Sequence, residues 1–234
     1  MSSVPLTPAS VDPDQIGRWY RQTRVITWPF RRLWLDVESQ GLGNVPADGP
    51  VILAANHLSF LDSLLLMYET PRQVVFLGKA EYLESRLTRR LFPAAGMIPV
   101  DRSGRGAGRS LRVAQGILAD GGVIGIFPEG TRSRDGLLHR GHAGVAHLAL
   151  RSGAPIIPVG ITGTDRAQPI GARVPRSGVP ITIRFGPPID LGGFRGRPAV
   201  GVVKQEITDR VMRAISTLSG QPHVAEDRPL PAII

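Results

Sequence analysis

Residues 51–67 read VILAANHLSFLDSLLLM, a short apolar run, a polar turn and a second apolar run. The first run, VILAA (51–55), is typical of a buried strand because it is short, continuous and apolar. The polar turn contains Ser59, a residue type that often caps a helix, with Asp62 three residues later. The LLLM run (64–67) then supplies the buried face of a helix. This strand, loop and helix predict an α/β fold with polar side chains at the end of the strand.

The rest of the chain repeats this alternation of short apolar strands and amphipathic helices. Further strands are expected at 32–38, 74–78, 96–100, 123–127, 154–161 and 181–186. Helices are expected at 81–92, 109–119, 141–152 and 199–218, and a flexible glycine-rich link at 104–108. In the first of these strands, Leu33, Leu35 and Val37 alternate onto one face. We therefore expect one α/β domain with a mostly parallel or mixed central sheet flanked by helices.

The two ends of the chain depart from this pattern. Residues 1–31 are expected to form a loose lead and an amphipathic helix at 14–30, rich in large aromatic residues and arginine. Such a helix either lies in a membrane interface or packs on the domain. The folded domain then covers 32–220, and 221–234 is expected to be a disordered tail. No apolar run reaches the ~18–20 residues that span a bilayer, and no signal-peptide pattern is present, so a cytoplasmic chain is expected.

The composition is basic and lacks cysteine. The 234 residues carry 28 Lys and Arg against 19 Asp and Glu, a net charge of +9, and only Lys79 and Lys204 are lysines. This charge predicts a polyanionic partner: nucleic acid, an anionic membrane or a phosphorylated substrate. The basic residues are dispersed among predicted strands and glycine-containing loops and form no continuous basic stripe, which disfavours nucleic acid. The absence of cysteine excludes disulfides, thiolate zinc sites and cysteine nucleophiles.

His57 and Asp62 are candidates for a catalytic pair. On one ideal helix, residues five apart point about 140° away from each other. They meet only if His57 lies in the loop before the helix and Asp62 in its first turn, which is what a cap at Ser59 predicts. Asp62 then accepts a hydrogen bond from one ring nitrogen and leaves the other nitrogen free as a base. The alternative is an ordinary loop histidine beside a capping carboxylate.

A second polar cluster is FPEGTRS (127–133), directly after an apolar strand. Pro128 and Gly130 force an irregular turn whose backbone can approach a ligand. Arg132 offers a fork of donors suited to phosphate, and Glu129 either binds a substrate hydroxyl or pins the loop. A plain strand exit with surface charges is the alternative.

Two more basic residues follow predicted strands. Arg102 ends GMIPVDR (96–102), and Lys79 lies in GKAEYL (78–83). Because the chain otherwise prefers arginine, a lysine at position 79 hints that a compact ammonium group is needed there. Solvent-exposed side chains remain the alternative for both.

The blocks NHLSFLD, GMIPVDR, FPEGTRS and IIPVGI have the order and approximate spacing of the conserved blocks of glycerolipid acyltransferases. Over about residues 30–190, the chain resembles the 1-acylglycerol-3-phosphate acyltransferase family. The resemblance implies transfer of a fatty acyl group from acyl-CoA or acyl-carrier protein to the sn-2 hydroxyl of 1-acylglycerol 3-phosphate, giving phosphatidate. It makes 32–220 the acyltransferase domain, His57 the general base and Asp62 its orienting partner.

The same resemblance implies a substrate site and partners. The substrate-binding residues are then Lys79, Arg102, Glu129, Gly130, Thr131 and Arg132, with the basic side chains on the phosphate. No metal and no resident cofactor are implied. The expected partners are the acceptor lipid, the acyl donor and the anionic inner face of the cell membrane, with no nucleic acid. Alternatives are the same chemistry on glycerol 3-phosphate, another lysophospholipid or a glycolipid, or a non-catalytic lipid- or nucleic-acid-binding protein.

Overall fold

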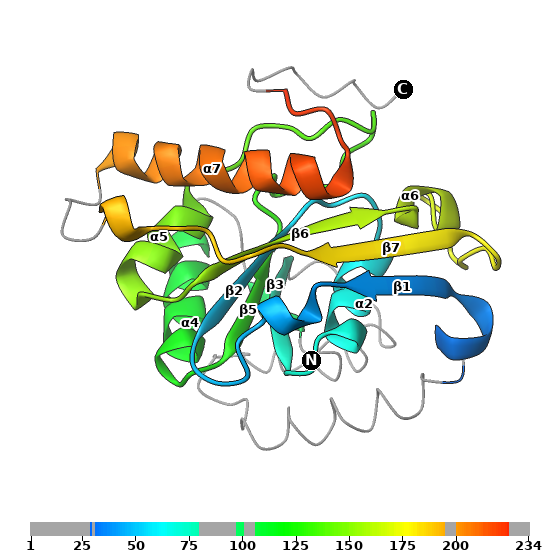
Figure 1. The fold of residues 1–234 in the computed structure, drawn as a ribbon, viewed down its shortest axis with the longest axis horizontal. Helices are drawn as coiled ribbons and strands as arrows, with labels where there is room; N and C mark the ends of the chain where they lie inside the picture. The colour runs from blue at the N-terminus through cyan, green and yellow to red at the C-terminus, as the bar shows by residue number, and fades with distance from the viewer. Residues whose placement is uncertain (1–28, 30, 80–96, 101–105, 195–199, 225–234) are drawn as a thin grey trace, which may run out of the picture.

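A seven-stranded sheet forms the centre of the computed structural model, which describes residues 29, 31–79, 97–100, 106–194 and 200–224 (Figure 1). Its strands are β1 (Asp36–Gln40), β2 (Val51–Ala55), β3 (Val74–Lys79), β4 (Met97–Val100), β5 (Val123–Ile126), β6 (Ile156–Thr162) and β7 (Pro180–Phe185). Their order across the sheet is β1-β7-β6-β2-β5-β3-β4.

The strands from β6 to β4 all run parallel, and β7 pairs antiparallel with β6. The edge strand β1 runs parallel to β7, so β1 and β7 point opposite to the other five. This mixed, mostly parallel sheet confirms the predicted fold class. The parallel strands also end on one common edge, and the polar blocks of the sequence follow these ends.

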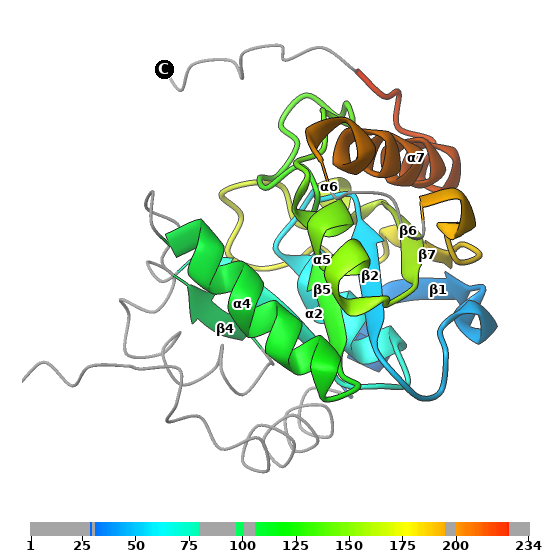
Figure 2. The same cartoon turned by 90° about the vertical axis from the view of Figure 1, so that its left-hand side faces the viewer.

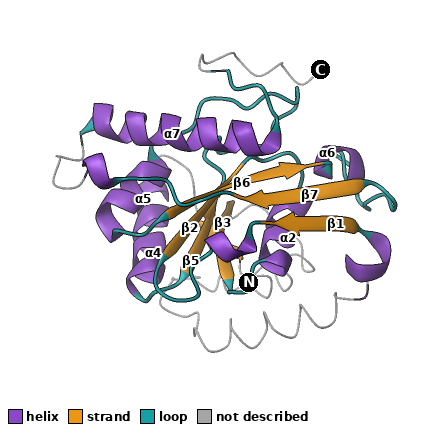
Figure 3. Cartoon of the chain, in the orientation of Figure 1, coloured by secondary structure: helices purple, strands orange, loops and turns teal. Residues whose placement is uncertain are grey.

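Helices cover both faces of the sheet, as Figure 3 shows by colour. They are α2 (Leu61–Glu69), α4 (Gly106–Ala119), α5 (Gly144–Ser152), α6 (Thr164–Ala167) and α7 (Gly201–Ser219), with short 3₁₀ turns η2 (Leu42–Asn44) and η4 (Gly192–Phe194). Side chains of α2 pack with alternate strand residues such as Leu53, whereas α4, α5 and α7 pack with the others, such as Ile52. Figure 2 shows α4 in front of β4, and α5 next to β2 and β5. Two apolar cores, one on each face, therefore hold the sheet.

The strand expected at 32–38 is wrong in its first half. Residues 31–34 form a helical turn, and the strand begins at Asp36. Leu33 is 84% exposed while Leu35 is buried, so the predicted alternation does not extend through the turn. Tertiary contacts fix the turn: the Trp34 Nε1 donates to the Pro175 carbonyl at 2.9 Å, and the Arg31 Nε donates to Glu69 at 2.7 Å.

Other boundaries also move. The flexible link expected at 104–108 is wrong from Gly106 onward, because α4 begins there. The tail is ordered at its start: Gln221 is buried, and Leu138 forms a parallel bridge with His223. The expected helices at 14–30 and 81–92 lie outside the described residues, as does most of the proposed lead at 1–31. No described helix is both long and apolar enough to cross a bilayer.

Candidate active site

The candidate site lies at the common edge where the parallel strands end. β2 leads into Asn56 and His57, and its neighbour β5 leads into Phe127 and the loop after it. β3 ends at Lys79 on the other side of β5. The sheet order therefore brings together segments that are far apart along the chain.

His57 and Asp62 form a hydrogen-bonded pair. The distance from His57 Nδ1 to Asp62 Oδ2 is 2.9 Å, with the His57 side chain 18% exposed and Asp62 fully buried. A carboxylate only accepts hydrogen bonds, so Nδ1 carries the proton of the neutral ring and Nε2 keeps its lone pair. Nε2 makes no hydrogen bond with the described residues. The pair therefore has the arrangement of a general base and its orienting acid.

Backbone N–H groups of the loop before α2 hold Asp62 in position beside His57. Asp62 Oδ2 also accepts the N–H groups of Leu58 at 2.6 Å and Ser59 at 2.8 Å. α2 begins at Leu61, one residue later than a cap at Ser59 requires, but Phe60 already has helical backbone angles. The Ser59 hydroxyl accepts the Leu61 N–H at 3.3 Å, so together with the Asp62 contact the predicted capping contacts are present. The same Ser59 hydroxyl donates to the Gln168 carbonyl at 2.8 Å. The carboxylate thus folds the loop back so that His57 lies beside the first turn of the helix.

An aromatic stack holds the plane of the His57 ring. The ring of Phe127 lies parallel to it, with centroids 3.9 Å apart and planes 9° apart. The Phe76 ring also stacks on Phe127, with the two ring centroids 5.3 Å apart. Gly125 makes room for Phe76, because a Cβ atom at position 125 would overlap that ring. A charged imidazolium against an aromatic face is also electrostatically favoured.

The loop after β5 is attached to the His57 segment by main-chain contacts. The Ser133 N–H donates to the His57 carbonyl at 2.7 Å, and the Gly130 N–H donates to the Phe127 carbonyl at 2.9 Å. Gly130 has a φ of 71°, a left-handed conformation that favours glycine. The irregular turn predicted at Pro128 and Gly130 is therefore present.

Glu129 is buried beneath this loop, with 6% of its surface exposed. Its Oε2 accepts the His139 N–H at 3.0 Å, and its Oε1 accepts the His57 N–H at 3.4 Å. Burial raises the pKa of Glu129 to about 7, and this outweighs the opposing effect of the two backbone donors. These contacts pin the loop to the His57 backbone, one of the two roles considered for this residue.

Comparison with known proteins identifies the family. A model of the family described as "Acyltransferase" matches residues 36–162, more than half of the chain. The chain belongs to the acyltransferase family. The matched region contains His57, Asp62 and the whole block 127–133.

The named relatives include enzymes of plants and of bacteria. The chain is 37% identical over 186 residues to a 1-acyl-sn-glycerol-3-phosphate acyltransferase of Limnanthes alba, covering 71% of this chain and 65% of that one. It is 29% identical over 186 residues to the enzyme of that name from Borreliella burgdorferi, covering 76% and 74%. The chain spans about half of another such relative, from Limnanthes douglasii, where the coverage is 50%.

A solved structure shares the fold. The crystal structure of the 1-acyl-sn-glycerophosphate (LPA) acyltransferase PlsC from Thermotoga maritima matches with a TM-score of 0.64 at 26% sequence identity. The match covers 88% of this chain and 78% of that chain.

The structure describes the remaining predicted site residues of this acyltransferase domain to different extents. Gly130 and Thr131 are exposed, and Arg132 is half-buried without a hydrogen bond or ion pair to the described residues. Lys79 is placed only by its backbone at the end of β3, and Arg102 lies outside the described residues. Among the described residues, no three His, Cys, Asp or Glu side chains form a group that could hold a metal ion.

Sequence analysis did not identify two residues that support the site, Asn56 and Gln221. The Asn56 side chain continues the sheet beyond β2, because its Oδ1 accepts the Ile161 N–H at 2.7 Å and its Nδ2 donates to the Ile161 carbonyl at 2.8 Å. The Asn56 Nδ2 also donates to Gln221 Oε1 at 2.6 Å. The segment after α7 therefore helps to fix the position of the loop that begins at Asn56 and His57. An amide directly before His57 was visible in the sequence, whereas nothing local pointed to Gln221.

The raised pKa of Glu129 predicts a pH-dependent stability. Folding raises the pKa of Glu129 from 4.5 to about 7, so the folded state binds this proton more tightly than the unfolded state. The resulting contribution to the free energy of unfolding is fully present below about pH 4.5 and is lost as the pH rises through 7. The free energy of unfolding is expected to fall by about 3 kcal/mol over this range because of Glu129. Glu129→Gln abolishes this fall, as urea unfolding at several pH values will measure. The exposed Glu38→Gln is the matched control, and parallel curves for wild type and Glu129→Gln would contradict the prediction.

Proposed function

We propose that this protein transfers a fatty acyl group from an acyl thioester to the free sn-2 hydroxyl of 1-acylglycerol 3-phosphate and so produces phosphatidate. The observation that carries the proposal is the 2.9 Å contact between His57 Nδ1 and Asp62 Oδ2, which leaves Nε2 as the available base. Membership in the acyltransferase family and the names of its relatives support the choice of reaction.

In the proposed mechanism, His57 Nε2 removes the proton from the acceptor hydroxyl. The oxygen attacks the thioester carbonyl and forms a tetrahedral intermediate. The intermediate collapses, the C–S bond breaks, and the imidazolium returns the proton to the departing thiolate. Asp62 holds the ring in the correct tautomer and stabilises its charged form, while the face of Phe127 favours the same charge. The acceptor itself is the nucleophile, so no acyl-enzyme is formed.

Basic side chains around the loop after β5 are proposed to hold the phosphate of the acceptor. Arg132 offers a bidentate fork for phosphate oxygens, with Lys79 and Arg102 as further cationic groups. The exposed Gly130 and Thr131 lie beside the glycerol. Buried Glu129 contributes by holding this loop against His57 rather than by direct contact.

The partners follow from the chemistry of the substrates. The donor is acyl-CoA or acyl-carrier protein, both of which present the same thioester. The acceptor is an amphiphile held in a bilayer, so the enzyme works peripherally at a membrane surface. A net charge of +9 favours an anionic surface such as the inner face of the cell membrane. The reaction as written requires neither a metal nor a resident cofactor.

The acceptor can be tested with a panel of matched compounds. Purified protein is offered 1-acylglycerol 3-phosphate, glycerol 3-phosphate, a lysophosphatidylcholine and a monoacylglycerol of the same chain length, each with acyl-CoA and with acyl-carrier protein. We expect transfer to be at least tenfold faster to 1-acylglycerol 3-phosphate than to the monoacylglycerol, because only the former offers a phosphate to charge-assisted hydrogen bonds. Absence of transfer to every acceptor, or equal rates for these two, would refute the proposed function.

A further inference from the structure

Large exposed apolar side chains gather at one end of the described structure. Four of them belong to two segments, the helical turn 31–34 and the loop 168–179 that joins α6 to β7: Leu33 at 84%, Trp34 at 43%, Ile170 at 40% and Val174 at 65% exposed. Exposure of this extent is unusual for neighbouring apolar residues of a domain that stays fully hydrated.

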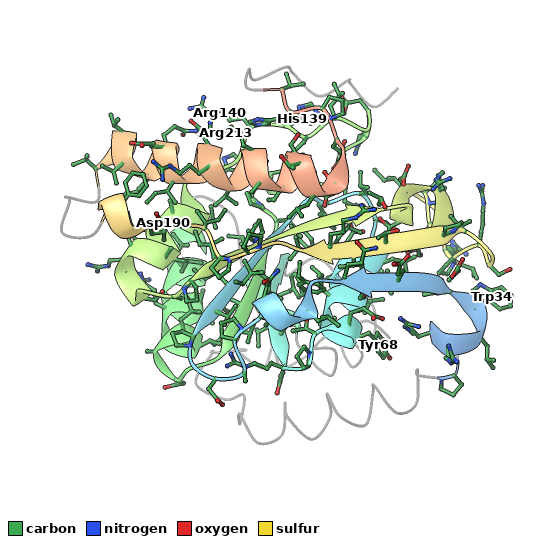
Figure 4. All side chains as sticks on the ribbon, viewed as in Figure 1. Trp34, Tyr68, His139, Arg140, Asp190 and Arg213 are labelled. Atoms are coloured by element: carbon green, nitrogen blue, oxygen red, sulfur yellow. The ribbon has the colours of Figure 1, made fainter. Side chains whose placement is uncertain are left out.

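The sheet places these two segments side by side. β1 and β7 are parallel neighbours, with Asp36 opposite Pro180, so the residues that precede each strand leave the same end of the sheet. The Trp34 Nε1 donates to the Pro175 carbonyl at 2.9 Å and joins them directly. Figure 1 shows the turn and the loop together at the right-hand end, and Figure 4 shows Trp34 there.

The same end of the molecule is basic. Exposed arginines from both segments accompany the apolar side chains: Arg32, Arg173 and Arg176. Arg166 in α6 is also exposed, and the exposed acids Asp36 and Asp165 offset only part of this charge. A hollow of about 300 Å³ between the segments is lined by groups that include Arg32, Trp34 and Ser177. Apolar residues with an indole and guanidinium groups match the layering of an anionic bilayer surface, apolar below and phosphate above.

This surface is connected to the candidate active site. The Ser59 hydroxyl, two residues after His57, donates to the Gln168 carbonyl at 2.8 Å, and Gln168 begins the loop that carries Ile170 and Val174. β6, which feeds this loop, ends on the same edge of the sheet as β2. A lipid surface under the loop is therefore on the side of the molecule where His57 lies.

We propose that Leu33, Trp34, Ile170 and Val174, with Arg32, Arg173 and Arg176, form a docking surface for an anionic phospholipid bilayer. The proposal rests on the proposed function in one respect, since the acceptor is taken to be a membrane lipid. A second copy of the chain is disfavoured as the occupant, because a two-fold contact would bring the arginines of both copies together. The side chains Leu33 and Val174 enter the bilayer interface, and the arginines lie at the level of the headgroup phosphates.

Vesicle binding by the full chain tests the docking surface. Wild type and a Leu33→Ser/Val174→Ser variant are sedimented with phosphatidylcholine vesicles that contain phosphatidylglycerol. We expect the double variant to bind about thirtyfold more weakly, from the lost burial of two apolar side chains. The matched control is Val200→Ser/Val202→Ser at the start of α7, where the side chains are 53% and 76% exposed, and it is expected to bind like wild type. Equal binding by wild type and the Leu33/Val174 variant, or equal losses in both variants, would overturn the docking surface.

Charge is tested separately with Arg173→Gln/Arg176→Gln. Binding to anionic vesicles is expected to fall about tenfold, and binding to pure phosphatidylcholine vesicles to stay unchanged. Equal losses on both kinds of vesicle would refute an anionic bilayer as the partner. Sedimentation velocity tests whether a second copy of the chain occupies this surface instead. A wild-type dimer that Leu33→Ser/Val174→Ser converts to a monomer would assign the surface to a second copy.

Rates of acyl transfer with dissolved and with vesicle-bound acceptor show whether the docking surface or the proposed function has failed. With a short-chain 1-acylglycerol 3-phosphate dissolved as monomers, the Leu33→Ser/Val174→Ser variant is expected to match wild type. With the long-chain acceptor in vesicles, its rate is expected to fall about as much as its binding. If wild type acylates no acceptor, the proposed function fails, while the vesicle-binding result still decides the docking surface.

Discussion

Replacing His57 by alanine is expected to lower kcat for acyl transfer by a factor of about 10²–10⁴ without unfolding the protein. The imidazole is the group positioned to remove the hydroxyl proton, and no described residue duplicates it beside Asp62. The ring is a loop side chain stacked on Phe127 and partly open to solvent, so its removal leaves both apolar cores intact. Steady-state rates with 1-acylglycerol 3-phosphate, together with thermal unfolding, measure the two effects.

The control is His147→Ala on α5, a half-buried histidine whose Nε2 lies 3.3 Å from the Gln115 Nε2 and outside the site. It is expected to keep the wild-type rate. A His57→Ala enzyme that works as fast as wild type would show that the proposed base is wrong.

Asp62→Asn is expected to have a smaller effect than His57→Ala, about tenfold on kcat. The N–H groups of Leu58 and Ser59 both point at Oδ2, so the amide oxygen of an asparagine, and not its NH₂ group, occupies that position. Nδ1 of His57 then still donates and Nε2 stays available, while the charge that stabilises the imidazolium is lost. A loss as large as that of His57→Ala would mean that the amide turned and reversed the tautomer.

Much of the fold could be predicted from local patterns. The strand at 51–55 has its predicted bounds, and the helix expected at 141–152 ends at Ser152 as predicted, with Gly153 after it in the left-handed conformation. The failure at 32–38 has a physical cause, because a helical turn there is fixed by partners at Glu69 and Pro175 that periodicity does not contain. Propensity and pattern describe a segment alone, and distant partners decide marginal cases.

The candidate site divides in the same way. Helix geometry and the expected cap at Ser59 predicted that His57 lies in the loop and Asp62 in the first turn of the helix. The 2.9 Å contact and the capping contacts of Ser59 both have this arrangement. The stacking of Phe127 on His57 and the brace from Gln221 depend on the order of strands in the sheet and on where α7 ends. No spacing rule in a single sequence carries that information.

Gly163→Ala is expected to lower the free energy of unfolding by about 4 kcal/mol. Gly163 lies directly after β6 with a φ of 87°, and alanine in this left-handed region costs about 1–2 kcal/mol. A Cβ atom there would also overlap the carbonyl oxygen of Pro180, the first residue of β7. Backbone cannot turn aside as a side chain can, so β6 and β7 must separate at their one antiparallel pairing, with an overpacking cost of about 1–3 kcal/mol.

Gly171→Ala separates these two causes. Gly171 has a φ of 93° in the loop that follows α6, and a Cβ atom there meets nothing within 4 Å. Its substitution carries only the conformational cost, which reduced freedom of the unfolded chain partly offsets, so a loss of about 1 kcal/mol is expected. Urea unfolding of both variants gives the difference. Equal losses would mean that the Pro180 contact has no energetic weight and that left-handed strain alone explains the need for glycine at position 163.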